Sequence, residues 1–309
     1  MSDEVHAPDD RPATFSDVFA SREFRAIYAA GALSWFGDYL AKAAVTAMVY
    51  ERTQSVAVAA ATFALTYVPW VLGGTLLSTL ADRYPYRRVM VVCDLVRMVL
   101  IALVALPQRP DIKLILVLLF LTALVSPPGQ AAKAALLPLI LTKDRLVVGL
   151  AVNTTTGQAA QVTGYLAGAA IAPFHPRLAL LIDAVTFGLS ALLIRLGVRN
   201  HPPVSSGQPR RHLVRETGDG IRLVFGTPVL RAIALLVFAS MLFAIVPEGL
   251  AAAWADDVSH TSAERGVSQG LIMAASPVGF IVGGLLISRL VRPLRRQALI
   301  RPLAILSPL

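Results

Sequence analysis

Three ionisable side chains lie inside long apolar stretches, where charge is rare and usually serves the movement of protons or solutes. Asp38 and Lys42 stand four residues apart in the stretch at 24–50, and Glu248 lies in the stretch at 229–255. At this spacing Asp38 and Lys42 share one face of a helix and can form an ion pair. A mutually neutralised pair that only fixes helix packing is the alternative to a functional role.

A degenerate internal repeat relates these two stretches. The sequence FRAI at 24–27 matches LRAI at 230–233, and the shift of 206 residues places Lys42 opposite Glu248. Under a two-fold axis along the membrane normal, both side chains would face one central cavity. We therefore predict that Asp38, Lys42 and Glu248 form a titratable cluster whose protonation competes with substrate or with a conformational switch.

The other chemistry-bearing residues predict neither a catalytic nor a metal site. The five histidines fall in tails or loops without a spaced partner, and Cys93 is the one cysteine. The sequence has no nucleophile elbow and no phosphate loop. We expect no enzymatic activity and no cofactor.

The composition is that of a membrane protein. The chain of 309 residues is 56% hydrophobic and only 15% charged, and its mean hydropathy of +0.66 exceeds that of soluble globular domains. With about 20 apolar residues per crossing, the pattern predicts an all-α polytopic protein in the lipid bilayer. The predicted spans are near 24–50, 55–80, 88–106, 112–140, 146–173, 177–199, 229–255 and 267–290.

The positive charges indicate an orientation in the membrane. The net charge is +9, but the basic residues fall mostly in short segments between apolar stretches, so we do not expect nucleic-acid binding. Most Lys and Arg residues lie on the same side as the N-terminus, which predicts a cytoplasmic N-terminus in the inner (plasma) membrane. The first 20 residues lack the features of a signal peptide.

Four segments are expected. These are a disordered cytoplasmic N-terminus at 1–22, a six-helix bundle at 23–199, a cytoplasmic linker at 200–228, and a partial second bundle at 229–309. A further apolar stretch begins near Gln297 and is too short to cross a membrane by Leu309. We therefore expect a chain cut off in its ninth span, with the second bundle incomplete.

A charged turn follows the second predicted span. Its sequence, LADRYPYRR, resembles the loop motif between spans two and three of the major facilitator superfamily. Asp82, Arg83 and Arg87 stand at the acidic and basic positions of that motif, and Arg88 follows them. The resemblance implies that this loop takes part in the conformational switch.

Further segments resemble one branch of that superfamily, the bacterial macrolide-efflux and enterobactin-exporter-like drug–proton antiporters. They are CDLVRMVLI, PPGQAAKAALLPLIL, LAVNTTTGQAAQVTGYLAGAAI and IDAVTFGLSALLI. The resemblance implies a secondary active transporter, with spans one and seven around a central cavity, that exports small amphipathic or hydrophobic compounds by proton antiport and alternating access. We expect a monomer. The alternatives are a narrower metabolite or siderophore exporter, and a non-transporting scaffold, sensor or inactive fragment.

Several further polar residues within the spans could support such a site. Asp94 and Arg97 are three residues apart, and we expect a packed ion pair near the membrane interface. Lys133 could reach the cytoplasm or answer Asp82. Asp183 is expected to reach the outer interface.

The fifth predicted span is rich in amide and hydroxyl side chains. Asn153, Gln158 and Gln161 could line a cavity or join helices to one another. Many proton-linked exporters of the superfamily carry a Gly-Pro pair in this span, whereas Gly164 is followed here by Tyr165.

Overall fold

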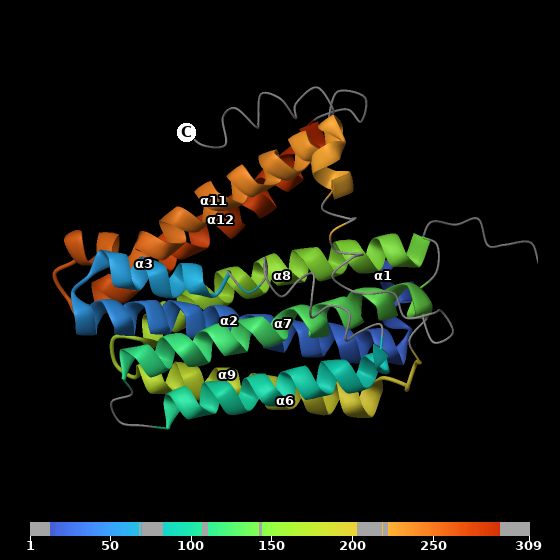
Figure 1. Cartoon of the computed structure of the whole chain (residues 1–309), viewed down its shortest axis with the longest axis horizontal. Helices are drawn as coiled ribbons and strands as arrows, with labels where there is room; N and C mark the ends of the chain where they lie inside the picture. The colour runs from blue at the N-terminus through green and yellow to red at the C-terminus, as the bar shows by residue number, and fades with distance from the viewer. Residues whose placement is uncertain are drawn as a thin grey trace, which may run out of the picture.

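All regular elements that the structure describes are helices. The computed structural model describes residues 13–67, 69, 83–106, 111–141, 144–202, 218 and 222–290. The helices, in chain order, are α1 (Phe15–Phe19), α2 (Arg22–Thr53), α3 (Val56–Leu65), α6 (Tyr86–Ala105), α7 (Ile112–Ile140), α8 (Asp144–Ile171), α9 (Pro176–Gly197), α11 (Pro228–Asp257) and α12 (Ser262–Leu290) (Figure 1).

The helix bounds follow the predicted spans closely. The predicted spans at 24–50 and 112–140, for example, correspond to α2 and α7. Most of the second span beyond α3 lies outside the described residues. So do most of the predicted linker and residues 291–309, where the ninth span was expected to start.

The chain is already ordered before the first span. Thr14 and Asp17 form a reciprocal capping box on α1, in which the Thr14 hydroxyl accepts from the Asp17 backbone. Val18 is fully buried, and the Phe19 ring packs edge-on against Phe24. These contacts give structure to residues within 1–22, a segment for which the sequence predicted disorder.

Local signals set the ends of the central helix, α2. Ser21 caps its N-terminus by accepting from the Phe24 backbone N–H at 3.3 Å. At the other end Gln54 adopts the left-handed conformation with a φ of 50°, and its N–H donates to the Tyr50 carbonyl. Ser55 then caps α3, so the chain reverses within a few residues.

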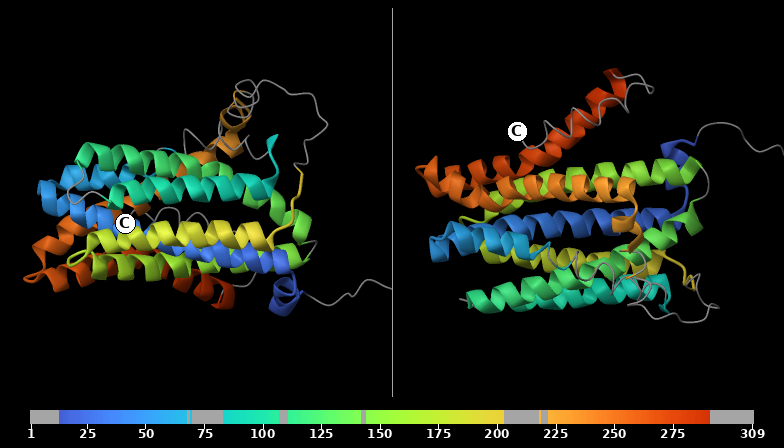
Figure 2. Two further views of the ribbon diagram at one scale, coloured as in Figure 1. Left: turned by 90° about the horizontal axis from the view of Figure 1, so that it is seen from below. Right: turned by 45° about the horizontal axis from the view of Figure 1, so that its top comes forward.

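Helices α2, α3, α6, α7, α8 and α9 form one bundle around α2. Helix α2 packs against both α8 and α9, α6 packs between α7 and α9, and α3 lies along α2 (Figures 1 and 2). Small residues permit the closest of these contacts: a Cβ at Gly164 or Gly168 would collide with the backbone of α2 near Leu40. The pair α8 and α2 therefore approaches backbone to backbone.

The last two described helices meet the bundle at one end only. Near the end of α2, α11 and α12 pack on α3 and α8, and Ala251 and Met273 are fully buried there. Toward the start of α2 the two helices lean away from the bundle (Figures 1 and 2). Val229 and Ile233 at that end of α11 are exposed. The molecule is thus closed at one end and splayed at the other.

Three described helices are both long and apolar enough to cross a membrane, namely Ile112–Ile140, Pro176–Gly197 and Ser262–Ile287. Helices α2 and α8 have ample length, with 32 and 28 residues. Their charged and amide side chains lower their hydropathy, and several of these face a cavity inside the bundle. A low hydropathy is expected for membrane helices whose polar side chains face an interior cavity.

Candidate functional site

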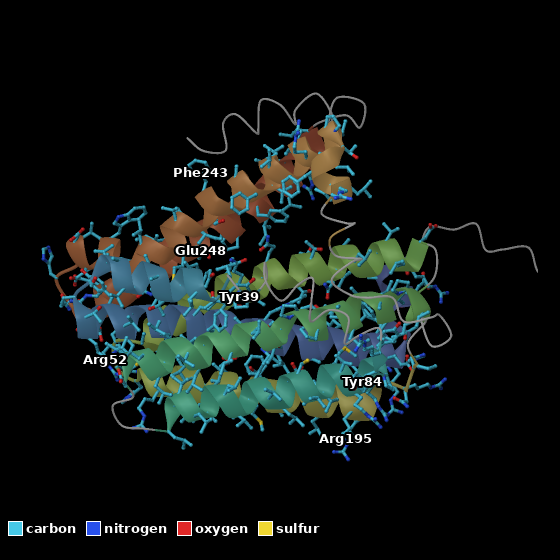
Figure 3. All side chains as sticks on the ribbon, viewed as in Figure 1. Tyr39, Arg52, Tyr84, Arg195, Phe243 and Glu248 are labelled. Atoms are coloured by element: carbon cyan, nitrogen blue, oxygen red, sulfur yellow. The ribbon has the colours of Figure 1, made fainter. Side chains whose placement is uncertain are left out.

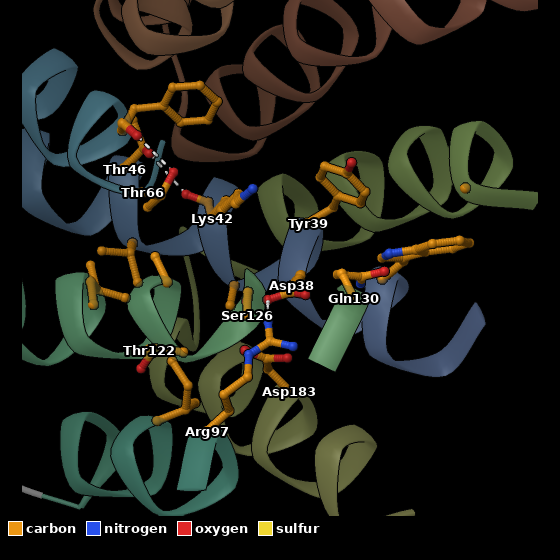
Figure 4. Close-up of a pocket in the computed structure, with 18 of the residues that line it drawn as sticks. Asp38, Tyr39, Lys42, Thr46, Thr66, Arg97, Thr122, Ser126, Gln130 and Asp183 are labelled. Carbon is orange, nitrogen blue, oxygen red and sulfur yellow. Dashed lines mark hydrogen bonds and ion pairs between the residues drawn. The ribbon is translucent and has the colours of Figure 1, made fainter. Parts of the chain in front are cut away.

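A cavity of about 400 Å³ lies inside the bundle, among α2, α3, α6, α7, α8 and α9 (Figure 4). Its size is within the range of about 300–1,000 Å³ typical of small-molecule sites. Aromatic, hydroxyl and amide side chains share the wall with four charged residues. The polar and aromatic members include Trp35, Tyr39, Thr46, Phe63, Thr66, Thr122, Ser126, Gln130, Asn153 and Gln158; the charged ones are Asp38, Lys42, Arg97 and Asp183.

An ion pair between α2 and α6 crosses the floor of this cavity. Arg97 Nη2 lies 2.5 Å from Asp38 Oδ1, and the guanidinium also stacks over the Phe187 ring at 4.0 Å. The expected pair of Asp94 with Arg97 is therefore wrong, and the alternative in which Asp38 pairs with Lys42 is not observed. Helix spacing favours both, but the long Arg97 side chain reaches from α6 to α2, where its Nη2 donates to Asp38 Oδ1.

The Lys42 ammonium points into the same cavity, between two aromatic rings. Its Nζ lies 5.0 Å from the centre of the Tyr39 ring and 4.8 Å from that of Tyr67. Both distances suit a cation–π contact. Asp38 and Lys42 thus share one cavity, as predicted, without forming an ion pair.

Glu248 lies beside this cavity, in the seam between α11 and α8 (Figure 3). Its side chain is only 4% exposed. The Tyr165 hydroxyl donates to Oε2 at 2.7 Å and the Gln161 amide to Oε1 at 3.3 Å. Lys42 attracts it through space. The structure thus places all three predicted cluster residues near one another, with Glu248 as the contribution of the second half.

Asp183 belongs to the cavity wall and does not reach the outer interface as expected. It is 1% exposed, and the Thr186 hydroxyl lies 3.5 Å from its Oδ1. A Cβ at Gly37 would collide with both side chains. The missing side chain at Gly37 therefore lets α9 place its carboxyl against α2, in the middle of the bundle.

A smaller cavity of about 40 Å³ adjoins the main one toward the start of α2. The Ser190 hydroxyl donates to Asp94 Oδ2 at 2.6 Å on its wall. Lys133 is 8% exposed, and its ammonium lies 4.2 Å from the centre of the Trp35 ring. No described residue accepts a hydrogen bond from Lys133 Nζ. Because Lys133 is buried, its ammonium does not reach the cytoplasm, whereas Asp82, the partner in the other predicted alternative, lies outside the described residues.

The polar run of α8 divides between the two roles that the sequence left open. Asn153 and Gln158 line the main cavity. Gln161 instead joins the halves through Glu248. Tyr165 does the same, and its hydrogen bond to Glu248 is shorter than that of Gln161.

Polar contacts close the end of the molecule where α2 finishes. Tyr50 donates to Asp256 at 3.3 Å, and Arg265 pairs with Asp256 at 2.7 Å and with Glu51 at 3.6 Å. Tyr50 and Asp256 are 206 residues apart, the offset of the internal repeat. A residue that touches its own repeat mate must lie near the two-fold axis. Deeper in, Gln269 donates to the Ala43 carbonyl of α2 at 3.0 Å.

The outermost of these contacts should be weak. Glu51 and Arg265 are each about one third exposed, so we expect Glu51→Gln to change the free energy of unfolding by less than about 1 kcal/mol. The effect should shrink further in high salt. Thermal unfolding of the purified protein at low and high ionic strength measures this. A loss of more than about 2 kcal/mol would show that the pair is desolvated and contributes like a buried one.

With this geometry in place, the sequence can be compared with known families. A family model described as Major Facilitator Superfamily matches residues 27–309. The chain belongs to this superfamily. It is therefore a membrane-embedded, multi-pass transporter protein and not an enzyme. A search of curated proteins finds no match.

Solved structures of a nucleoside transporter and a peptide transporter share the fold of this chain. The nucleoside transporter NupG superposes with a TM-score of 0.63 at 13% identity, over 86% of this chain and 68% of that one. A peptide transporter POT in complex with sulfate gives a TM-score of 0.58 at 14% identity, over 91% and 70%. At these identities the likeness concerns the fold alone.

The loop motif of the superfamily is only partly visible. Asp82 lies outside the described residues. Arg83 and Arg88 are exposed, and Arg87 donates from Nη1 to the Val198 carbonyl at 3.3 Å. Arg87 thus ties the start of α6 to the end of α9, and the switching role of the loop stays a prediction.

Sequence reasoning missed the aromatic residues of this superfamily member's site. Trp35, Tyr39 and Tyr67 surround the cations, but apolar helices are rich in aromatic residues that only pack. One signal was present: Trp35, Tyr39 and Lys42 recur at spacings of four and three, and so lie on one face of α2. Gln130 gave no comparable signal.

Proposed function

We propose that this chain is an inner-membrane secondary transporter that exports small amphipathic compounds in exchange for protons, as a monomer with a cytoplasmic N-terminus. The observation that carries the proposal is the cavity of about 400 Å³ in the first bundle, where charged and aromatic side chains face one space. In a membrane protein that does not transport, we would expect such charged groups to be packed against one another and not to face a cavity.

The closed and splayed ends support alternating access. Among the described residues, hydrogen bonds and ion pairs between the two halves lie at the end of α2 and along its second half, whereas α11 and α12 diverge from the bundle at its start (Figure 2). With a cytoplasmic N-terminus, this is a state closed to the outside and open toward the cytoplasm. An exporter would load its substrate in such a state.

The lining of the cavity bears on the substrate. A purely hydrophobic compound offers no hydrogen-bond partners to the hydroxyl, amide and charged side chains of the wall. Polar groups that are buried without a partner reduce the free energy of binding. The similar solved structures are those of a nucleoside transporter and a peptide transporter. An amphipathic compound fits better than a wholly hydrophobic one, and a metabolite or siderophore exporter with a narrow range is the second candidate.

Proton coupling is tested by neutralising the two carboxyls of the cluster. We expect Asp38→Asn and Glu248→Gln each to lower proton-driven export by about 5- to 150-fold, the usual size of a coupling between two sites. Export should also lose its dependence on pH, because the titrating group is gone. Efflux from proteoliposomes of the full chain, with and without an imposed pH gradient, measures both effects.

Two exposed carboxyls supply matched controls. Asp111→Asn keeps a residue that caps a helix equally well, and Glu264→Gln changes a carboxyl at the surface of α12; neither should alter export. Unchanged gradient-driven export in both cluster variants would make the cluster structural. If no compound moves under any gradient, the protein is better described as a scaffold or sensor.

A further inference from the structure

The Lys42 ammonium faces the main cavity. It lies in the wall of the main cavity near the middle of α2 (Figure 4). Its close neighbours are the faces of the Tyr39 and Tyr67 rings. Among the described residues no carboxylate lies within ion-pair distance of its Nζ.

The carboxylates around Lys42 are already engaged elsewhere. Asp38 is held by Arg97 at 2.5 Å, and Glu248 accepts from Tyr165 and Gln161. Asp183 lies against Thr186. Each therefore attracts Lys42 only across a gap. Of the two cations on the described cavity wall, Lys42 is therefore the one that no carboxylate holds in an ion pair.

The charges of the wall limit the charge of a bound solute. Asp38 and Asp183 balance Lys42 and Arg97 on the cavity wall. Among the described residues, a dianion would meet one cation without an ion-pair partner and the three carboxylates around it, so a single negative charge suits the space better. A cationic compound would have to approach the Lys42 ammonium, and the cost of that repulsion in a poorly hydrated cavity is high.

The aromatic and amide side chains of the cavity wall indicate the shape and polarity of the rest of the solute. Trp35 and Phe63 contribute aromatic surface to the cavity, and Gln130 and Gln158 contribute amides. Flat apolar groups stack well on such rings. The volume, at the low end of the range for small-molecule sites, suits a compact compound.

We propose that Lys42 binds the carboxylate of the transported compound, and that the substrates are small monoanionic carboxylates with a flat aromatic body. This inference rests on the proposed transport function and adds the substrate class. Arg97 is held by Asp38 and serves to keep that carboxylate away from Lys42. Tyr39 and Tyr67 hold the ammonium in position by their ring faces.

Binding to the purified full chain tests the charge preference without any transport step. The probes are benzoate and 1-naphthoate, each paired with its uncharged carboxamide, and calorimetry in detergent measures their affinities. The carboxylates should bind at least tenfold more tightly than the amides, since a hydrogen bond to a charged group adds roughly that much. Equal affinities, or no binding of either carboxylate, would overturn the proposal.

Variants at Lys42 test the residue. Lys42→Met should weaken carboxylate binding by about 10- to 100-fold and leave amide binding unchanged, while Lys42→Arg should retain the preference. If Lys42→Met weakens both members of each pair equally, Lys42 only packs against the tyrosines. If Lys42→Met does not fold, Lys42→Gln takes its place, and the affinities of the unchanged protein for each carboxylate and its amide still test the proposed charge preference.

The outcome is separable from that of the transport proposal. Gradient-driven export of neutral or cationic compounds without any carboxylate preference would overturn this inference and leave proton-driven export standing. Conversely, Lys42-dependent binding of carboxylates without gradient-driven movement would support the site and refute the antiport mechanism.

Discussion

Arg97→Gln should destabilise the protein more than any other single change in the cavity. The substitution leaves Asp38 without its partner inside the bundle, and it removes the guanidinium from the Phe187 ring. Breaking one side of a buried ion pair typically costs about 3–5 kcal/mol. We expect about 3 kcal/mol, at the low end, because Asp38 keeps 23% of its side chain exposed to the cavity.

A double substitution separates the lost pair from lost packing. Asp38→Asn combined with Arg97→Gln removes both charges and should recover at least half of the loss, measured by thermal unfolding in detergent. Arg195→Gln is the matched control, since Arg195 points away from the bundle (Figure 3). Additive losses in the double variant would mean that Arg97 contributes by packing alone.

The fold was predictable because it depends on patterns that one sequence carries. Apolar stretches of sufficient length predicted α2 and α7 nearly residue by residue. The repeat predicted that the second half places Glu248 near Lys42, and the Tyr50–Asp256 contact at the same offset fits that symmetry. The lengths of apolar stretches, their hydropathy and the repeat can all be read along the sequence without knowing which helices pack together.

The pairing of charges was not predictable in the same way. Spacing along a helix tells which residues share a face, and it placed Asp38 with Lys42 and Asp94 with Arg97. The observed partners lie on other helices: Asp38 meets Arg97 across α2 and α6, and Asp94 meets Ser190 across α6 and α9. Which faces meet depends on packing, and small residues such as Gly37 set that packing without any sign in the charge pattern.

One departure from the expected pattern became informative in the structure. Tyr165 follows Gly164 where many proton-linked exporters carry proline, and its hydroxyl binds Glu248. Gly164 meanwhile permits the close approach of α8 to α2. Helix α8 runs unbroken from Asp144 to Ile171, and Tyr165 joins it to α11 at a position where a proline would remove a backbone hydrogen bond and kink the helix.

Gly266→Val should open the closed end of the transporter. A Cβ at Gly266 would lie 2.5 Å from the Ala169 carbonyl oxygen and 3.0 Å from Pro173 of the neighbouring half. Neither neighbour is the flexible end of a side chain, so α12 must move away from α8. Overpacking of this kind typically costs about 1–3 kcal/mol, which shifts the equilibrium between two conformations by about 5- to 150-fold.

A cysteine at Thr46 reports the opening. Thr46 is 1% exposed and lines the cavity on the side of the closed end. In a Cys93→Ser background, Thr46→Cys should react faster with an impermeant maleimide added at that end when Gly266→Val is present. The rise in rate should follow the shift in population.

Gly279→Val provides the control on the same helix. No described atom lies within 4 Å of a Cβ built at Gly279, so the same added side chain should leave the labelling rate unchanged. If both variants accelerate labelling alike, the effect comes from the helix propensity of α12 and not from its contact with α8. If neither does, the α8–α12 contact does not close this end, and the seal must come from the polar contacts of Asp256 and Arg265.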